Sequence, residues 1–435
     1  MTRGMLAAVL VLLVPVPQSV PWWNGAWGLR RAITVTVGAN TPQGGYVGYT
    51  VRLSSLDTAA MIAAGDLLAS GDDLRIVRWD GAAWTDLPRH VVGLNSAATD
   101  VRFALAAPIA ASAADGSYFL YYRNPAAGAP PAMTTTNVYR WFDDGSADRL
   151  PSYVNGRVHA SGPSNGLTTP SSFAFNAGAG AYEYNTTDNF SESLRPTGVA
   201  ERDVLVSYDL YQTGAYGVNM ASGPLARLTT DGGAPAAEIA AGFYLYLLCD
   251  SGANPGAPYA GHGDIAQNAI QSGGGLVDGS GSPIGQVALN AWHSVGLAAW
   301  GAGATTLKAW YVNAPSAGSL GLFGAPASLT GSQATGDTTA SGAAGLYLCQ
   351  DIGRVRNILI RRYTEPEPVS SLAAVENAPA GGGGPPPSGG GGGGGGGSDG
   401  KCGCGSSGLR GPAALLAAVL ALAAIILREV RLPRA

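Results

Sequence analysis

The chain has 435 residues, of which 12% are charged and 65 are glycine, and its formal net charge is −4. This composition argues against a helical cytosolic protein coated with charged side chains. An acidic surface repels phosphate backbones, so we expect no nucleic acid partner. Removal of the targeting segments described below would take away five arginines and one glutamate, which makes the remainder more acidic still.

Residues 1–20 have the pattern of a secretory signal peptide. Arg3 supplies a positive charge near the start, and an apolar segment follows over residues 5–16. This segment has the length of the hydrophobic part of a signal peptide and is too short to span a bilayer. We therefore expect the protein to be exported.

Residues 22–125 are expected to form a β-sandwich. Apolar and polar residues alternate in short runs that clusters of Gly, Asn, Asp and Pro separate, which is typical of an antiparallel all-β domain. The runs cover residues 32–37, 46–53, 74–79, 101–105 and 118–122. A short helix is expected within residues 57–68.

A linker over residues 126–136, which begins with a proline-rich stretch, leads into a second domain over residues 137–368. Its strand candidates are too many for one small sandwich, and long Gly and Ser loops join them. A jelly roll of the concanavalin type accommodates such a number of strands. The sequence therefore predicts an all-β fold with two sandwiches in tandem.

Three blocks of the first domain resemble a bacterial extracellular module named domain of unknown function 2341. They are Trp27-Gly-Leu-Arg-Arg-Ala-Ile-Thr-Val35, Gly71-Asp-Asp-Leu-Arg-Ile76 and Tyr118-Phe-Leu-Tyr-Tyr-Arg-Asn-Pro125. Arg123 stands where that family usually has glycine. Members commonly carry a lectin-like jelly roll behind the module, and residues 137–368 are similar to one of the concanavalin A-like, laminin G-like type. The resemblance implies this domain order and no defined biochemical activity.

The C-terminal tail has four parts in a fixed order. A Gly- and Pro-rich spacer covers residues 378–401, Cys402 and Cys404 follow, and an uncharged apolar stretch over residues 411–427 precedes the last arginines. Seventeen helical residues reach roughly 25 Å, enough to cross a thin bilayer core, and arginines prefer its cytoplasmic side. The tail therefore predicts a transmembrane helix that places the preceding residues outside the cytoplasm.

This order resembles the C-terminal sorting signal of myxobacterial-type surface proteins. In that family a protease cuts near the cysteine during transfer to the outer surface. The resemblance implies a surface or outer-membrane location, a sorting protease as partner, and a processing or lipidation role for Cys402 and Cys404. A plain single-span anchor is the alternative.

Two further cysteines end two similar apolar runs. Cys249 and Cys349 would form a disulfide if their strands are neighbours, closing a loop of about 100 residues and contributing about 4 to 5 kcal/mol. The alternative is a pair of buried free thiols.

Candidate site residues are aromatic or acidic. Sugar binding needs an aromatic platform with polar neighbours, and Trp310, Tyr246 and Tyr208 are candidates as a group, although any of them could instead fill the core. Asp143, Asp144 and Asp351 could bind a structural calcium ion if the first and last strands of the jelly roll are adjacent. The alternative is that Asp143 and Asp144 form a turn before Gly145.

Catalytic patterns are weak. Ser164 lies in a Gly-x-Ser-x-Gly match, but in an expected loop and without the strand-to-helix turn of hydrolases. No pair of carboxylates alternates along any predicted strand, as a glycosidase would need. We therefore expect a non-catalytic, surface-displayed binding or adhesion protein that recognises a glycan or another envelope component. The alternative is a secreted or surface-attached glycoside hydrolase, or an accessory in polysaccharide degradation.

Overall fold

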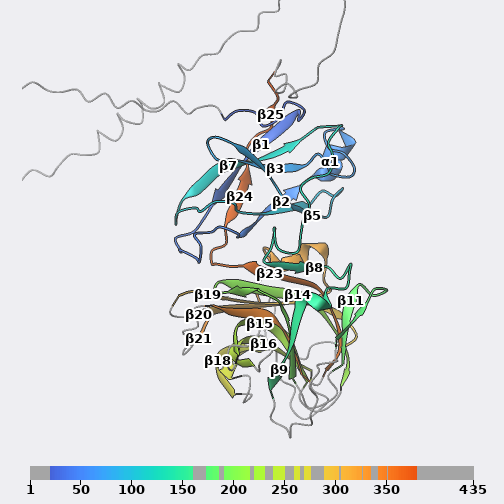
Figure 1. The fold of residues 1–435 in the computed structure, drawn as a ribbon, viewed down its shortest axis with the longest axis vertical. Coiled ribbons are helices and arrows are strands. Elements are labelled where there is room, and N and C mark those ends of the chain that lie inside the picture. The colour runs from blue at the N-terminus through green and yellow to red at the C-terminus, as the bar shows by residue number, and fades with distance from the viewer. Residues whose placement is uncertain are drawn as a thin grey trace, which may run out of the picture. The chain divides into compact units, whose positions relative to one another are not determined.

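A computed structural model describes most of the chain between Val20 and Pro379 (Figure 1). The described residues are 20–159, 173–185, 191–215, 220–230, 239–249, 259–264, 269–275, 289–302, 305–325, 327–334, 341–349 and 351–379. The chain divides into two units, residues 1–384 and 385–435, and every described residue belongs to the first unit.

The prediction of an all-β protein is confirmed, because four antiparallel sheets make up the described part of the chain. The short helix expected within residues 57–68 is α1 (Thr58–Ala63), and Asp57 caps it by accepting a hydrogen bond from Ala60 N. Two short 3-10 helices, η1 (Leu150–Ser152) and η4 (Ala317–Leu322), also occur.

The first sandwich pairs a larger sheet A with a smaller sheet B. Sheet A has the order β24 (Val369–Leu372), β1 (Leu29–Thr36), β7 (Ala114–Tyr122), β3 (Arg75–Trp79), β4 (Trp84–Leu87). Sheet B has the order β2 (Thr50–Leu56), β6 (Thr99–Ala104), β5 (His90–Val92). Alternate residues such as Ile33, Val101 and Leu120 are fully buried in one core, which explains the period-two pattern of the sequence.

Sheet A contains strands from both ends of the described chain. β24 pairs antiparallel with β1, with Ile33 opposite Leu372, and the two-residue strand β25 (Glu376–Asn377) continues this pairing beside Leu29. An ion pair of 2.8 Å joins Arg30 Nε to Glu376 Oε2. The chain therefore returns to the first sandwich after it has formed the second, which the sequence pattern did not predict.

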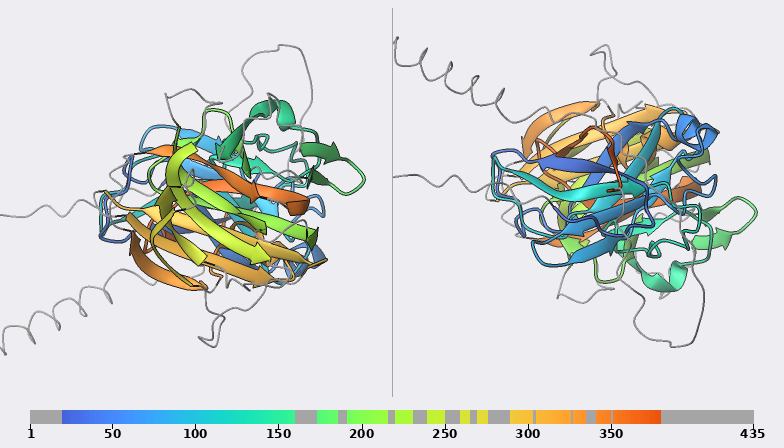
Figure 2. Two further views of the ribbon diagram at one scale, coloured as in Figure 1. Left: turned by 90° about the horizontal axis from the view of Figure 1, so that it is seen from below. Right: turned by 90° about the horizontal axis from the view of Figure 1, so that it is seen from above.

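The second sandwich consists of two large sheets that lie face to face (Figure 2). Sheet C has the order β10 (Phe173–Asn176), β11 (Ala181–Asn185), β23 (Asp351–Arg362), β14 (Val204–Ala215), β19 (Trp292–Trp300), β20 (Thr305–Asn313), β21 (Leu329–Ala334), and β8 (Trp141–Asp143) also pairs with β23. Sheet D has the order β18 (Ala269–Gly275), β17 (Tyr259–Asp264), β16 (Ile239–Cys249), β15 (Met220–Thr230), β22 (Gly342–Cys349), β12 (Ser191–Pro196), β9 (Tyr153–His159), and β13 (Ala200–Glu201) also pairs with β22.

The core of the second sandwich lies between sheets C and D. Val206 of β14 and Leu297 of β19 belong to the same buried cluster as Leu346 of sheet D. The alternate residues of sheet C face the other way, and Leu205 and Ala298 among them form a second cluster on the outer face. Both faces of sheet C are thus partly buried, one by sheet D and the other by residues outside the sandwich core.

Side chains of the first sandwich contact segments that pack on the outer face of sheet C, namely the residues before β8 and those after η4. Thr50 Oγ1 donates to Val138 O at 2.7 Å, and Arg52 Nη1 donates to Phe323 O at 2.8 Å. The guanidinium carbons of Arg102 and Arg361, one from each sandwich, lie 4.8 and 3.9 Å from the ring centroid of Phe323. These contacts hold the two sandwiches together along the face that also carries the pocket described below.

The predicted disulfide rests on strands that are not neighbours. Cys249 of β16 lies opposite Met220, and Cys349 of β22 lies opposite Ala221, so strand β15 separates the two cysteines. Two strand spacings amount to roughly 10 Å, whereas the Cα atoms of a disulfide are at most about 7 Å apart. The condition for the disulfide, neighbouring strands, is therefore not met. Both cysteines lie at the same end of sheet D, on either side of the first residues of β15.

No helix in the described part of the chain is long and apolar enough to cross a membrane. The predicted signal peptide over residues 1–20 and the predicted transmembrane helix over residues 411–427 lie outside the described residues, apart from Val20 itself, and so do Cys402 and Cys404.

Candidate functional site

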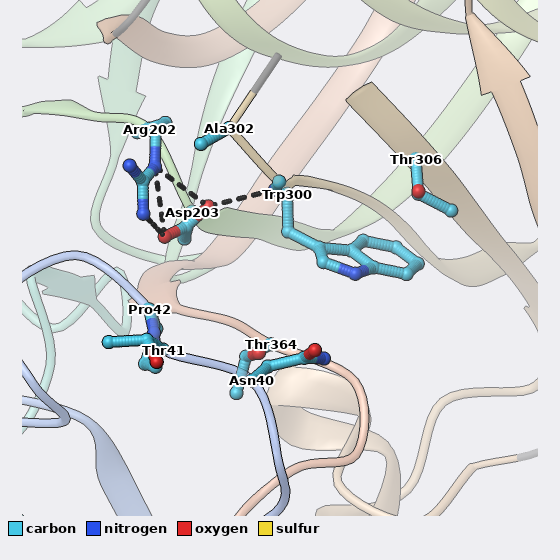
Figure 3. A pocket seen from close by; sticks show the side chains of 10 residues that line it. Asn40, Thr41, Pro42, Arg202, Asp203, Trp300, Ala302, Thr306 and Thr364 are labelled. Atoms are coloured by element: carbon cyan, nitrogen blue, oxygen red, sulfur yellow. Dashed lines mark hydrogen bonds and ion pairs between the residues drawn. The ribbon is translucent and has the colours of Figure 1, made fainter. Parts of the chain in front are cut away.

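A pocket of about 360 Å³ opens where the first sandwich meets one corner of sheet C (Figure 3). The loop between β1 and β2 contributes Asn40, Thr41 and Pro42. The second sandwich contributes Arg202, Asp203, Trp300, Gly301, Ala302, Thr306 and Thr364. Its walls thus come from four separate segments of the chain.

Trp300 forms the aromatic side of the pocket. It is the last residue of β19 and lies opposite Thr306 of β20, and strand alternation places its neighbour Ala299 in the core between the sheets. The indole ring packs edge to face on Tyr363, with 5.1 Å between the ring centroids. In Figure 3 the indole lies above the side chains of Asn40 and Thr364.

Asp203 connects the walls of the pocket through hydrogen bonds. Its buried carboxylate accepts hydrogen bonds from Gln43 N of the first sandwich at 2.9 Å and from Gly301 N of the β19–β20 hairpin at 3.0 Å. Arg202 Nη2 donates to the same carboxylate at 2.7 Å. Burial opposes ionisation of Asp203, but these hydrogen bonds outweigh it and lower the pKa of the carboxyl below its ordinary value.

Arg227 supports the pocket from inside the second sandwich. Its buried guanidinium donates to Gly301 O at 2.9 Å and to Thr305 Oγ1 at 2.6 Å, and Nη2 lies 3.7 Å from Asp203 Oδ1. Both ends of the hairpin that follows Trp300 are therefore held by a rigid charged group.

Several polar atoms of the pocket are open to a ligand. Asn40 Nδ2 donates to Glu365 O, which holds the amide in place. Within the described part of the chain, Asn40 Oδ1, Trp300 Nε1 and Thr306 Oγ1 take part in no hydrogen bond. A flat aromatic ring beside uncommitted donors and acceptors fits a ring-shaped ligand that carries hydroxyl groups.

The structure separates the three aromatic residues predicted as a group. Tyr208 is 2% exposed and lies in the core between sheets C and D, while Trp310, also 2% exposed, lies on the opposite face of sheet C. Trp310 Nε1 donates to Ala325 O at 3.1 Å. Tyr246 lies opposite Tyr259 in sheet D, and its side chain is outside the described residues. Burial in two different clusters means that Tyr208 and Trp310 do not form a common platform.

The three acidic residues predicted as calcium ligands do not meet either. Asp143 lies opposite Ile358 of β23, seven residues beyond Asp351, which corresponds to roughly 23 Å along a strand. Asp143 is buried and accepts hydrogen bonds from Tyr153 OH at 2.9 Å and Tyr182 OH at 2.6 Å.

The alternative for the acidic pair, a turn before Gly145, agrees with the structure. Gly145 has a φ of +73°, and Asp144 Oδ1 accepts a hydrogen bond from Ser146 N at 2.9 Å. Among the described residues, no group of three or more His, Cys, Asp or Glu side chains could hold a metal ion. Calcium binding stays a prediction.

The sequence pattern did not single out the residues that line the pocket. Trp300 is one of several strand aromatics, and alternation alone does not distinguish it from Trp310. Nothing in the sequence around Asn40 indicates that its loop reaches the second sandwich, because the contact joins residues 160 positions apart, Gln43 and Asp203. The pair Arg202-Asp203, placed just before a strand, has the pattern of a turn.

Known proteins resemble this chain only distantly. The sequence matches no protein-family model and no curated protein. Similar solved structures include the carbohydrate-binding module CBM66 from Bacillus subtilis, at 10% identity and a TM-score of 0.27 over 41% of this chain and 86% of that one. They also include the metal-free Emp46p carbohydrate recognition domain (10%, TM-score 0.29, 49% and 89%) and the Lotus tetragonolobus seed lectin (7%, TM-score 0.26, 54% and 99%).

At such identities and TM-scores these likenesses carry no argument about function. The resemblances of residues 27–125 and of the C-terminal tail to known families stay predictions, since no family model matches. The function proposed below depends on the geometry of the pocket.

Proposed function

We propose that the protein is a non-catalytic glycan-binding protein whose pocket between the two sandwiches takes one sugar ring. The observation that carries this proposal is the position of Trp300 beside Asn40 and Thr306, because Asn40 Oδ1 and Thr306 Oγ1 form no hydrogen bond within the described part of the chain. An indole covers the apolar face of a pyranose ring, and the amide and hydroxyl groups bond to its hydroxyls.

The number and state of the carboxylates in the pocket favour a binding protein over a glycosidase. Glycosidases use two carboxylates on either side of the scissile bond, whereas Asp203 is the one carboxylate among the described residues that line this pocket. Its oxygens already accept hydrogen bonds from Gln43, Gly301 and Arg202. Because its pKa is lowered, Asp203 is ionised at neutral pH and is a poor proton donor to a leaving group.

The charges of the pocket favour a neutral sugar. Arg202 and Asp203 are the charged residues among the described ones lining it, and they form an ion pair of 2.7 Å with each other. Recognition of an acidic sugar would require a cation without a paired carboxylate. The described lining of this pocket presents no such cation.

We also propose that the protein is exported and held at the cell surface by its tail. Support comes from the signal-peptide pattern of residues 1–20 and from the spacer, cysteines and apolar stretch over residues 378–435. A Gly-rich spacer of 24 residues spans on average roughly 25 Å, which would hold the sandwiches clear of the lipid. Mass spectrometry of both termini of the mature protein, with cell fractionation, tests export and trimming directly.

The pocket is tested by replacing its aromatic wall. A glycan array of neutral and acidic sugars, followed by calorimetry on the sugars that bind, is expected to select neutral ones. Trp300→Ala should weaken the binding at least about tenfold, or about 1.4 kcal/mol. Trp292→Ala is the matched control, because Trp292 begins the same strand and does not line the pocket.

Three results would contradict the proposal. The first is an affinity of Trp300→Ala equal to that of the unchanged protein, and the second is no binding of any sugar. The third is release of new reducing ends from a bound glycan, which would show catalysis.

A further inference from the structure

A second pocket, of about 450 Å³, lies along the same strand as the first. On β20, Leu307 and Ala309 point into the core between the sheets. The alternate residues face the other way: Thr306 lines the first pocket, while Lys308 and Trp310 line the second. Alternate residues of a strand are about 7 Å apart, so the two pockets occupy successive positions on one face of β20.

The segment after β23 runs beside both pockets in the same order. Thr364 lines the first pocket, and residues 365–370 line the second. Lys308 Nζ of β20 forms an ion pair of 2.7 Å with Glu365 Oε2 of this segment, and the two residues closely follow Thr306 and Thr364, which line the first pocket. This pair is partly exposed and presents both donors and acceptors at the boundary between the pockets.

The first sandwich closes the second pocket on its other side. Arg52 and Ser54 of β2 line it, and Arg52 Nη1 is held by its hydrogen bond to Phe323 O. Val369 lines it as well and is 66% exposed. The pocket therefore combines an apolar edge with hydroxyl and charged groups, as a site for part of a sugar chain requires.

The charged residues of the second pocket are balanced. Lys308 pairs with Glu365, Arg52 Nε lies 2.9 Å from Asp100 Oδ1, and Glu367 forms an ion pair with Arg361. Like the first pocket, the second therefore has no unpaired charge on its described lining that would select an acidic group.

We propose that the two pockets are adjacent subsites of one groove, and that the natural ligand is a neutral oligosaccharide of several units, not a single sugar. The inference rests on the proposed function, because it takes the first pocket as the subsite for one sugar ring. The Lys308–Glu365 pair then bonds to the hydroxyls of the units that pass from one pocket to the other.

Dependence of affinity on chain length tests the groove. The probes are neutral gluco-, manno- and galacto-oligosaccharides of one to five units, measured by calorimetry against the full chain. We expect the affinity to rise at least about tenfold between one and four units.

Two substitutions should remove this gain by filling the second pocket. Ser54→Phe enters it from the first sandwich, and Val369→Trp enters it from β24, where the exposed position tolerates a large side chain. Each should reduce the affinity for the four-unit chain to about that for one unit. Thr85→Phe is the matched control, because Thr85 is exposed on β4 and lines neither pocket.

The outcomes separate this inference from the proposed function. If single sugars bind and Trp300→Ala abolishes their binding, but longer chains bind no better, the groove is refuted and the first pocket stands. A chain-length gain that survives both filling substitutions also refutes it. If no sugar of any length binds, the proposed function fails and the groove fails with it.

Discussion

His90 is a partly buried histidine at the contact between sheet B and the segment that enters the second sandwich. Its Nδ1 lies 2.9 Å from Tyr139 OH, and its ring centroid lies 5.0 Å from that of Phe142. Burial, aided by the nearby charge of Arg102 and opposed by that of Asp144, lowers the pKa of the imidazole from 6.5 to about 4. The folded protein therefore keeps this ring neutral where the unfolded chain would protonate it.

Stability should consequently fall on acidification. Between pH 6.5 and pH 4 the unfolded chain binds a proton at His90 that the folded state does not bind, so the free energy of unfolding decreases by up to about 3 kcal/mol as the pH drops through this window. His90→Gln, which is not titratable, should show a flatter profile in urea unfolding at three pH values spread across this window. Parallel profiles for the two proteins would contradict this assignment.

The alternation of the sequence shows which residues of a strand share a face. It does not show whether other parts of the protein cover that face. Alternation correctly separates Trp310 from Leu307 and Ala309. It cannot show that the outer face of sheet C is itself buried, because the residues that cover it come from the first sandwich and from η4. The pattern alone therefore allows Tyr208 and Trp310 as parts of a platform, although both are buried. Trp300, which lies on the same face of sheet C as Trp310, is the aromatic residue that lines the first pocket.

At the scale of elements, sequence reasoning missed several strands, such as β4, β5 and β24, and β24 shows the reason most clearly. The strand is short, and its four residues are exposed or partly exposed in alternation, so it has no buried face that would indicate it. Its position depends on a partner, β1, that lies at the other end of the described chain. By contrast, the alternating runs at residues 32–37, 74–79 and 118–122 correspond to β1, β3 and β7, since each carries its own buried face.

Loss of β24 should weaken the first sandwich and expose an edge. Two fragments, of residues 20–374 and 20–368, differ by this strand and the two residues after it. The shorter fragment lacks four paired residues and should lose about 2 to 6 kcal/mol, at roughly 0.5 to 1.5 kcal/mol for each net hydrogen bond. The bared β1 should also promote self-association.

Unfolding in denaturant and light scattering measure these two effects. The fragment of residues 20–374 keeps β24 and lacks β25, so it serves as the control for truncation itself. Equal stability of the two fragments would mean that β24 only lies against β1 without supporting it.

At the scale of the whole molecule, the pocket belongs to both sandwiches. Asn40 comes from the first and Trp300 from the second, and Asp203 ties the two walls through Gln43 N. A jelly roll considered alone would therefore lack one side of the site. The sequence predicted two sandwiches in tandem, but not that they share a site, because no local pattern records contacts between distant segments.

Asn40→Ala should accordingly weaken sugar binding although it lies outside the jelly roll. We expect a loss of about three- to tenfold, or roughly 0.7 to 1.4 kcal/mol, since one acceptor is removed. Asn24→Ala is the control, because Asn24 also belongs to the first sandwich and its Oδ1 accepts from Ala26 N away from the pocket. An unchanged affinity for Asn40→Ala would assign recognition to the second sandwich alone.

The pairing of β24 with β1 also sets an order of events during synthesis. Ile33 and Leu372, which lie opposite each other, are 339 positions apart. At about 5 to 20 residues per second a ribosome needs roughly 17 to 70 seconds to cover that distance. Until residues 369–372 have been added, β1 has no partner on this side, and an open strand edge can pair with another chain.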